Sequence, residues 1–422
     1  MELFKFLRIF LYVIKSYIGS FFNNSIIETK NLTNKNALLL TPFRREEKLD
    51  LILKDLNIGA VHLNNNYQKK IHGIFFLRYG LRYYEHINKI SSQKFRIFFY
   101  KIFILNLLKY LKKKYKIKFV INFAIHYKSE FLFDELSTKL NLKFLTFHRE
   151  CLYASENTQE FIKSKLQNAP KFKGHKIIVH NFIAKKIFCE SKFCEEEKIE
   201  IIGPLRIDDN LKFSQKSMIE KKNKTILFYI FGTGSMMMKD EDYGSDWVSN
   251  NGWSNLLNNT YSGIISTAKN FHDCEFIFKA KYNSRNYSDY HKKKIINFNG
   301  KNISYLSSEN NYSLLLKSDL IISFNSTTII EAALFNKNIL IPCFDEAQNK
   351  DYSKFIGFKE LHKSKVICNS KDDFQKKLSN FIQNKDDFLL NDIDKSILFK
   401  NYISEVDGKN EQRVKELFLK EI

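Results

Sequence analysis

Residues that break or cross-link a chain are scarce in this sequence. Its 422 residues include 14 Gly, 4 Pro and 6 Cys, against 40 Phe and 21 Tyr. The cysteines form no CxxC pair and have no companion histidines at zinc-site spacing, so we expect free thiols in a reducing compartment. The six are Cys151, Cys189, Cys194, Cys274, Cys343 and Cys368.

The start of the chain lacks a long uncharged apolar run, because Glu2, Lys5, Arg8 and Lys15 interrupt it. A secretory signal needs an uninterrupted apolar stretch before a cleavage site, and a membrane-spanning helix needs about twenty apolar residues. Apolar residues recur here at helical spacing instead, which predicts an amphipathic helix over 1–24. That helix either lies on a membrane surface or packs on its own domain. The residues at this spacing are Leu3, Phe6, Leu7, Phe10, Val13, Ile14 and Tyr17.

Acidic residues are too few to balance the basic ones. There are 46 Asp and Glu against 68 Lys and Arg, a formal net charge of +22. This excess favours anionic partners. The lysines are scattered, and the sequence has no helix-turn-helix, RNA-recognition or zinc-finger signature, so we do not expect nucleic acid. Nucleotide phosphates and the anionic inner leaflet of a membrane both fit the charge.

Short apolar runs alternate with amphipathic stretches from Asn36 onward, the pattern of parallel sheets covered by helices. At this length, two domains of about 200 residues each are expected. In the first half we expect strands at 36–41, 59–63, 118–125, 143–147, 176–180 and 199–202, and helices at 45–56, 94–115, 129–140 and 182–191. In the second half we expect strands at 225–231, 275–279, 303–306, 320–323 and 339–341, and helices at 254–271, 328–335, 371–383 and 408–420.

The sequence therefore predicts an α/β chain with two Rossmann-like, doubly wound domains. The strand carboxyl ends of both domains would face one cleft, where such folds bind ligands. We assign 1–24 to the amphipathic helix, 25–208 to the N-terminal domain, 209–224 to a linker, 225–406 to the C-terminal domain and 407–422 to a C-terminal helix. The helix expected at 94–115 is basic and rich in aromatic residues. It either touches lipid or, as is more usual, packs inside with a solvated lysine face.

The strongest local motif lies where the strand at 320–323 runs into the next helix. Ser326, Thr327 and Thr328 begin that helix, so hydroxyls and backbone N–H groups converge where the helix dipole favours an anion. This arrangement predicts a phosphate site. The competing interpretation is plain capping, because Thr328 and Glu331 form a T-x-x-E capping box.

A glycine turn follows the first strand of the second half. Gly232 and Gly234 could let the backbone approach donor phosphates, although a tight turn explains the pair equally well.

Four segments together resemble one family. Ser318–Lys337 resembles the nucleotide-binding motif of GT-B-type bacterial glycosyltransferases for surface carbohydrates such as capsule and lipopolysaccharide, a group related to CMP-sugar and teichoic-acid transferases. The segments Phe-His-Arg-Glu at 147–150, Ile-Gly-Pro-Leu-Arg-Ile-Asp at 202–208 and Phe-Ile-Phe-Lys-Ala-Lys at 276–281 resemble the same group. The C-terminal Asp407-Gly408 leading to Arg413-Val414 also matches, so the resemblance covers about 148–414.

The resemblance implies a GT-B fold and metal-independent transfer from a nucleotide sugar, which is a co-substrate, with no other cofactor. It also implies that Glu331 contacts the donor ribose. The sequence has no convincing DxD motif. It departs from the family at Lys279-Ala280-Lys281, where several relatives carry His-Pro, and at Ser326-Thr327, where two serines are common. The choice among UDP, CMP, GDP and dTDP therefore stays open.

Sugar transfer with inversion needs a base that removes the acceptor hydroxyl proton. Glu150 and His148 follow a strand of the first domain at the cleft, so either could be that base. We favour Glu150, because Arg149 can orient it and a histidine there could equally be structural. Glu156 is a third choice.

Positive groups must stabilise the departing phosphate. Lys279, Lys281 and Arg206 each follow a strand at a cleft-facing end and are the expected clamps, although most lysines in such a chain are simply solvated. Arg44 and Arg45 follow the first strand, where this fold places a loop near the acceptor. Their alternative is an ordinary helix start.

We therefore expect a cytoplasmic glycosyltransferase, peripheral on the inner face of the cytoplasmic membrane. Its partners would be a nucleotide sugar and a surface polysaccharide or lipid-linked glycan acceptor. Two alternatives stay open at this point: a nucleotide-sugar 2-epimerase of the same fold, and a non-catalytic polyanion-binding protein, whose affinity would depend on salt.

Overall fold

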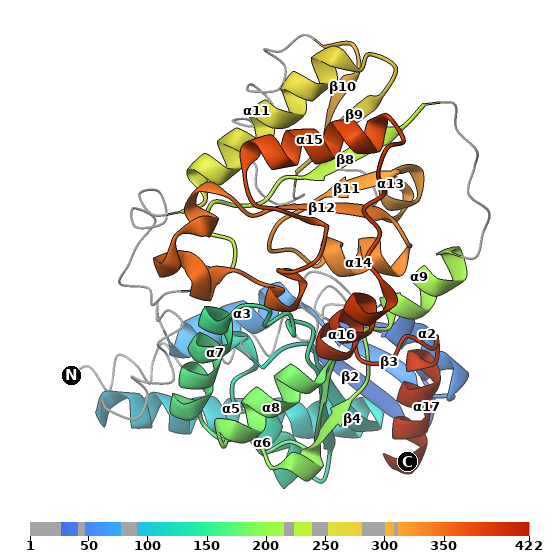
Figure 1. Ribbon diagram of the computed structural model, residues 1–422. Helices are drawn as coiled ribbons and strands as arrows, with labels where there is room; N and C mark the ends of the chain where they lie inside the picture. Colours follow the sequence, from blue (N-terminus) through green and yellow to red (C-terminus); the bar gives the residue numbers. More distant parts are fainter. Residues whose placement is uncertain are drawn as a thin grey trace.

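The computed structural model describes residues 27–40, 47–76, 91–125, 127–214, 223–238, 252–280, 300–307 and 311–421 (Figure 1). The helix expected over 1–24 lies outside these residues. Among the described residues, no helix combines the length and apolar character needed to cross a bilayer. The six cysteines are free, and five of them are buried.

The first sheet has seven strands in the order β1-β3-β2-β4-β5-β6-β7. All neighbours pair in parallel except β1, which runs antiparallel to β3. The strands are β1 (Ile27–Lys30), β2 (Asn36–Leu40), β3 (Gly59–Leu63), β4 (Ile117–Asn122), β5 (Lys143–Phe147), β6 (Lys176–Val179) and β7 (Ile199–Ile201). Every residue of β2 and β3 is buried, as expected for parallel strands covered on both faces.

Helices cover both faces of this sheet. They are α2 (Glu47–Asp55), α3 (Asn65–Phe75), α5 (Ser91–Tyr115), α6 (Phe133–Lys139), α7 (Glu156–Asn168) and α8 (Phe182–Glu190). The single helix predicted over 129–140 is wrong in detail. A 3-10 turn, η1 (Lys128–Glu130), comes first, and α6 begins only after Leu132, whose φ of 67° is left-handed and interrupts an α-helix.

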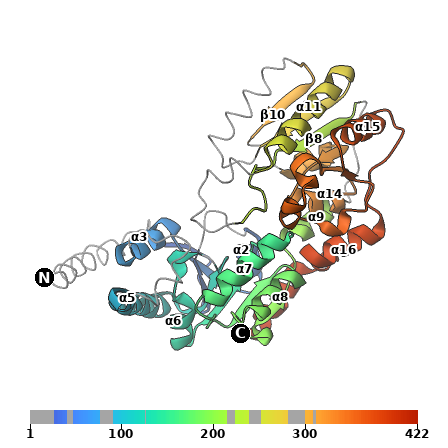
Figure 2. The same cartoon turned by 60° about the vertical axis from the view of Figure 1, so that its left-hand side comes forward.

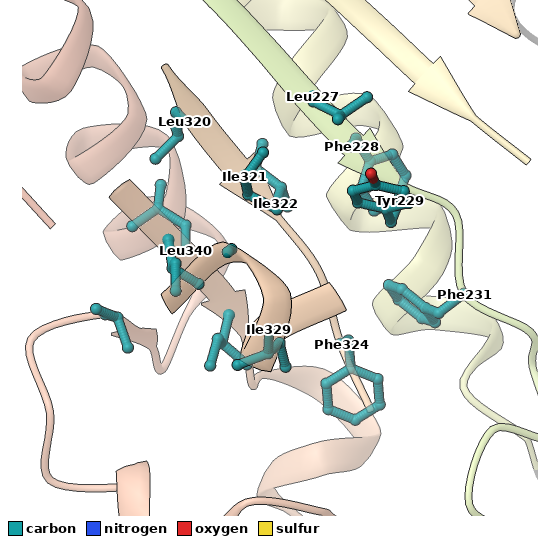
Figure 3. Close-up of a cluster of buried hydrophobic side chains, with 14 of the residues drawn as sticks. Leu227, Phe228, Tyr229, Phe231, Leu320, Ile321, Ile322, Phe324, Ile329 and Leu340 are labelled. Atoms are coloured by element: carbon teal, nitrogen blue, oxygen red, sulfur yellow. The ribbon is translucent and has the colours of Figure 1, made fainter. Parts of the chain in front are cut away.

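The second sheet has six strands in the order β10-β9-β8-β11-β12-β13, and all its pairs are parallel. The strands are β8 (Thr225–Tyr229), β9 (Glu275–Lys279), β10 (Ile303–Leu306), β11 (Leu320–Ile322), β12 (Asn338–Pro342) and β13 (Ile367–Cys368). Its helices are α11 (Ser254–Asn270), α13 (Asn311–Lys317), α14 (Thr328–Leu334) and α15 (Lys371–Ile382), with 3-10 turns η3 (Asp345–Gln348), η4 (Lys350–Phe355) and η5 (Lys359–Leu361). Figure 3 shows how the apolar side chains of β8 and β11 meet Ile329 of α14 in one buried core.

The chain returns to the first sheet at its C-terminal end. Helix α9 (Arg206–Ser214) leaves the first sheet, and α16 (Asp392–Tyr402) leads back to α17 (Asn410–Glu421). Phe418 of α17 packs against Phe119 and Phe147 of β4 and β5, with ring centroids 5.4 and 6.1 Å apart. Helix α17 therefore belongs to the core of the first sheet.

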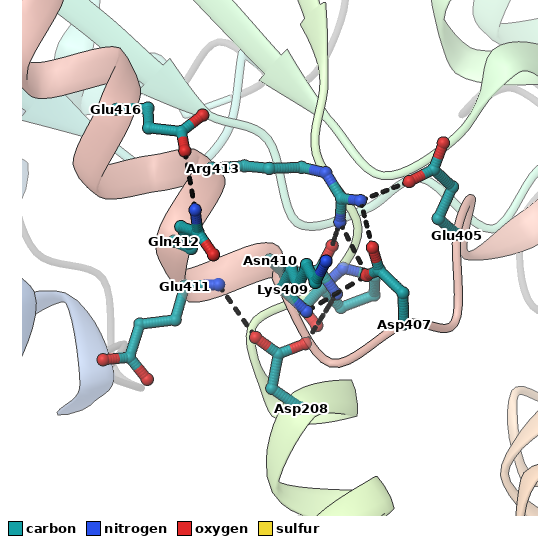
Figure 4. Close-up of polar contacts among 10 residues, drawn as sticks. Asp208, Glu405, Asp407, Lys409, Asn410, Glu411, Gln412, Arg413 and Glu416 are labelled. Atoms are coloured by element: carbon teal, nitrogen blue, oxygen red, sulfur yellow. Dashed lines mark hydrogen bonds and ion pairs between the residues drawn. The ribbon is translucent and has the colours of Figure 1, made fainter.

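Asp208 holds α17 at this crossing (Figure 4). Its carboxylate accepts hydrogen bonds from the Glu411 backbone N–H at 2.8 Å and the Asn410 side chain at 3.0 Å. Arg413 pairs with Asp407 at 2.6 Å. At Gly203, a Cβ would lie 2.6 Å from the Ile403 carbonyl oxygen, so only glycine allows the returning segment this close approach.

Candidate active site

A cavity of about 950 Å³ lies between the two sheets. Its lining comes from the carboxyl ends of strands in both. Asn122 ends β4, Arg149 and Glu150 follow β5, and Thr327 and Glu331 follow β11. The cavity therefore occupies the place where open parallel sheets bind ligands.

An ion pair crosses the cavity between the two domains. Arg206, at the start of α9, approaches Glu331 of α14, with Nε and Oε1 3.5 Å apart. Burial raises the pKa of the Glu331 carboxyl, and Arg206 partly offsets this rise. Glu331 therefore contacts Arg206. The N-cap residue of α14 is Thr327, and its side chain makes no capping hydrogen bond. The competing interpretation, a Thr328–Glu331 capping box, is not what the structure has, because the Glu331 carboxylate faces the Arg206 guanidinium.

The three hydroxyl residues at the start of α14 have different partners. Ser326 Oγ accepts from the Thr328 backbone N–H at 3.3 Å and from its hydroxyl at 3.1 Å. The Thr328 hydroxyl also lies 2.6 Å from the buried hydroxyl of Ser323. Thr327 lines the cavity. Of these three residues, Thr327 is thus the one placed to meet a ligand, and α14 itself is only seven residues long.

The Lys279 side chain is buried and bonds to backbone carbonyl groups. Its side chain is 5% exposed, and its ammonium donates to the carbonyl oxygens of Ala280 at 2.8 Å and Ser307 at 3.3 Å. The predicted position at the end of β9 is correct, but the ammonium folds back onto the β9 and β10 ends. Lys281 lies outside the described residues.

The glycine turn after β8 connects the domains. Backbone hydrogen bonds of 3.0 Å join Ser235 to Gly232 and Met237 to Gly234. The loop then reaches the start of α7, where the Met238 backbone N–H donates to Asn157 Oδ1 at 2.8 Å. These contacts indicate that the turn positions the two domains against each other.

Glu150 and His148 are placed very differently. Glu150 is exposed and lines the cavity beside half-buried Arg149. His148 is fully buried, its Nε2 lies 2.8 Å from the Tyr153 hydroxyl, and its ring packs against Phe188. Tyr153 lines the cavity, so His148 stands behind it. This arrangement favours Glu150 for contact with a substrate and a positioning role for His148.

The sequence analysis did not identify two further titratable side chains in this region, Glu130 and His180. Glu130 is 7% exposed and accepts a hydrogen bond from Asn122 Nδ2 at 2.8 Å. Burial raises its pKa well above the usual range. In the sequence it looked like an ordinary polar residue of an amphipathic helix. Glu130 is buried because a 3-10 turn precedes Leu132, and no local pattern in the sequence predicts this turn.

His180 is the second such group. It directly follows β6, so its place at a strand end was a usable signal. Burial, with smaller effects of Arg206 and Arg149, lowers its pKa to about 3. His180 lines a small cavity together with Arg149 and Arg206 near the interdomain seam.

Two remaining expectations concern the acceptor side and metals. Arg44 and Arg45 lie outside the described residues. Within the described ranges, no three His, Cys, Asp or Glu side chains gather as a metal site would require.

Comparison with known proteins relates the chain to others through its fold. The chain matches no protein-family model, and no curated protein matches its sequence. The UDP-GlcNAc 2-epimerase of Methanocaldococcus jannaschii superposes with a TM-score of 0.51 and 15% identity, over 92% of this chain and 99% of that chain. The UDP-GlcNAc 2-epimerase of Neisseria meningitidis, solved with UDP-GlcNAc bound, gives 0.51 and 12%, over the same shares. The predicted fold is therefore confirmed: the chain has the GT-B architecture, two Rossmann-like domains that face a cleft.

Proposed function

We propose that the chain is a glycosyltransferase that binds a nucleotide sugar in the interdomain cavity and transfers the sugar to a surface polysaccharide or lipid-linked glycan. One observation carries this proposal. The cavity joins the carboxyl ends of both parallel sheets, with guanidinium groups from the first domain opposite Thr327 and Glu331 of the second. Such a site suits a ligand with an anionic centre.

The donor phosphates would lie between Arg206, Arg149 and the Thr327 hydroxyl. Guanidinium groups form charge-assisted hydrogen bonds with phosphate oxygens, and these bonds strengthen as charge develops on the leaving group. Binding would compete with Glu331 for Arg206, because the same guanidinium lies 3.5 Å from that carboxylate. The proposed transfer needs no metal, because the arginines supply the positive charge.

Proton transfer would fall to the carboxylates of the first domain. Glu150 would take the proton of the acceptor hydroxyl as its oxygen forms the new bond to the sugar C1. The bond from C1 to the donor phosphate breaks, and its electron pair leaves with the nucleotide. Glu130 also lines the cavity, and because burial raises its pKa it would hold a proton at higher pH than an exposed glutamate.

The cavity offers room for an acceptor next to the donor. It extends from the seam into the first domain between β5 and α7, where Phe144, Phe161 and Phe172 line it. Its volume of about 950 Å³ is near the upper end of ordinary ligand pockets, roughly 300–1,000 Å³. This space favours a reaction with two substrates.

The second candidate is a nucleotide-sugar 2-epimerase, which the shared fold of the two solved epimerases favours. An epimerase would invert C2 of the donor sugar without an acceptor, and its product would still be attached to the nucleotide.

Nuclear magnetic resonance of the products separates the two reactions. Thermal-shift screening of UDP-, CMP-, GDP- and dTDP-linked sugars identifies the donor, because a bound ligand stabilises the folded state. The protein is then incubated with that donor, with and without a lipid-linked glycan extract. Release of free nucleotide that depends on the extract supports the transferase. A new sugar epimer, still attached to the nucleotide in the absence of extract, would establish the epimerase instead.

A further inference from the structure

Helix α5 has one face in the core and an apolar stripe on the opposite face. Tyr100, Ile104, Leu108 and Leu111 are completely buried. Phe95, Phe98 and Ile102 point away from this core and are 40%, 56% and 39% exposed. Their spacing of three and four residues places them side by side on one face of the helix. The sequence left two alternatives for this helix, contact with lipid or a solvated lysine face, and the exposed large side chains of its first half are mainly apolar.

Basic residues lie at both ends of this stripe. Lys94 is exposed beside Phe95, and the same face continues to exposed Lys109 and Lys113. The helix contains no Asp or Glu. An apolar stripe bordered by lysines is the surface that lies in the interface of an anionic bilayer, where aromatic rings enter the headgroup region and ammonium groups meet phosphates.

Helix α16 provides a contrast within the same molecule. Ile393 and Ile397 are also exposed, at 73% and 40%, and lie one helical turn apart. Here Asp392 and Asp394 are balanced by Lys395 and Lys400, so α16 has no excess of basic charge. Exposed apolar residues therefore occur on both helices, and only α5 combines them with a basic border.

The position of α5 connects this stripe to the cavity. Lys101 of α5 pairs with Glu135 of α6 at 3.2 Å, and Glu135 also pairs with Lys173 at 2.9 Å. Glu135 and Lys173 line the cavity. Figure 2 shows α5 at the end of the first domain away from the second domain. A bilayer on this side would therefore leave the second domain free and bring lipid close to the acceptor end of the cavity.

We propose that the stripe Phe95, Phe98 and Ile102, with its basic border, docks the first domain on an anionic lipid bilayer. Only the role of this docking, which is to present a lipid-linked acceptor to the cavity, rests on the proposed function. Binding to the bilayer itself needs no sugar.

Co-sedimentation of the full chain with vesicles tests the docking directly. The probes are vesicles of phosphatidylcholine with phosphatidylglycerol and vesicles of phosphatidylcholine alone. The test variant carries Phe95→Ser, Phe98→Ser and Ile102→Ser, and the matched control carries Ile393→Ser and Ile397→Ser. All five positions are exposed, so unchanged melting temperatures are expected. If the triple variant nevertheless fails to fold, the single variant Phe98→Ser is tested in its place.

We expect the wild type and the α16 control to bind the anionic vesicles equally well. The triple variant should bind roughly tenfold more weakly, and binding of the wild type should fall in high salt. Equal binding by the triple variant, or an equal loss in the α16 control, would overturn the proposal. No sugar is present in this experiment, so a loss of vesicle binding leaves the transferase proposal standing. If instead vesicle binding is intact and sugar transfer fails, only the transferase proposal is removed.

Discussion

The two walls of the interdomain cavity differ in what they offer a ligand. The first-domain wall presents Arg149, Glu150 and Arg206 together with buried Glu130. The second-domain wall offers fewer polar groups to a ligand, because the Lys279 ammonium donates to backbone carbonyls and the Ser326 hydroxyl accepts from Thr328. The sequence assigned donor binding mainly to the second domain.

This difference shows that phosphate recognition would depend on both domains. The positive charge that faces the cavity from the described residues comes from the first domain, and Glu331 of the second holds Arg206 in place. The same ion pair joins the domains, so a ligand that attracts Arg206 would also change the contact between them. Variants on each wall can separate these roles.

The largest expected effect concerns proton transfer from the first wall. Glu150→Gln should lower turnover by roughly 10²–10⁴-fold, because a general base is lost. Donor affinity should stay close to wild type, since the amide keeps the size of the side chain. Steady-state kinetics and calorimetry measure the two effects. Glu156→Gln is the matched control, because Glu156 is exposed and pairs with Lys359 at 2.7 Å. Normal turnover of Glu150→Gln, with a large loss in Glu130→Gln, would move the base to Glu130.

The next effect concerns Arg206. Arg206→Ala should weaken donor binding by about 1.5–3 kcal/mol, or roughly 10- to 150-fold, because a charge-assisted bond is lost. It also leaves the buried Glu331 carboxylate without this guanidinium. The double variant with Glu331→Gln should therefore recover melting temperature but not affinity. Recovery of affinity in the double variant would mean that Arg206 serves only the ion pair.

A smaller effect separates two neighbours on the second wall. Thr327→Val should weaken donor binding by about 0.5–1.5 kcal/mol, because one hydroxyl bond to the ligand is lost, with little change in stability. Ser326→Ala should do the reverse, lowering stability by about 1 kcal/mol with nearly unchanged affinity, because its hydroxyl satisfies the Thr328 N–H. Calorimetry and chemical denaturation distinguish the two outcomes. Equal effects of both substitutions on affinity would show that the whole helix start contacts the donor.

The smallest effect is a pH dependence caused by Glu130. Because burial raises the folded-state pKa, the folded protein binds more protons than the unfolded chain above pH about 4.5, and stability falls as pH rises towards the folded pKa. The slope for one such group is at most about 1.4 kcal/mol per pH unit. Glu130→Gln removes this term, so its stability relative to wild type should rise with pH. A constant difference between the two proteins across that range would show that Glu130 is not perturbed by burial.

The strands were largely predictable from the sequence, and the reason is their composition. Strands β3, β5, β9 and β10 begin and end at the residues predicted, because short apolar runs bounded by polar residues define buried parallel strands. The weaker elements were missed. Helix α7 has a polar face and a Ser155 cap, and α16 shows little apolar periodicity, so both resembled loops.

The candidate site was predictable only in position. Glu150, Arg206, Thr327 and Glu331 line the cavity because they follow strand ends of a parallel sheet. Their partners were not predictable, because the Arg206–Glu331 pair joins residues more than a hundred positions apart. Lys279 shows the same limit: a strand-end lysine can face a ligand or fold back onto carbonyls, and only the neighbouring β10 end decides between them.

Calorimetric titration of UDP-, CMP-, GDP- and dTDP-linked sugars into the full chain tests the central claim most directly. We predict that one nucleotide class binds with a stoichiometry of about one, as expected for one site formed by both walls. The double variant Arg206→Ala and Thr327→Val, which changes one residue of each wall, should lose this binding while it stays folded. Binding of none of the four sugars, or equal binding by the wild type and the folded double variant, would contradict a nucleotide-sugar site in the interdomain cavity.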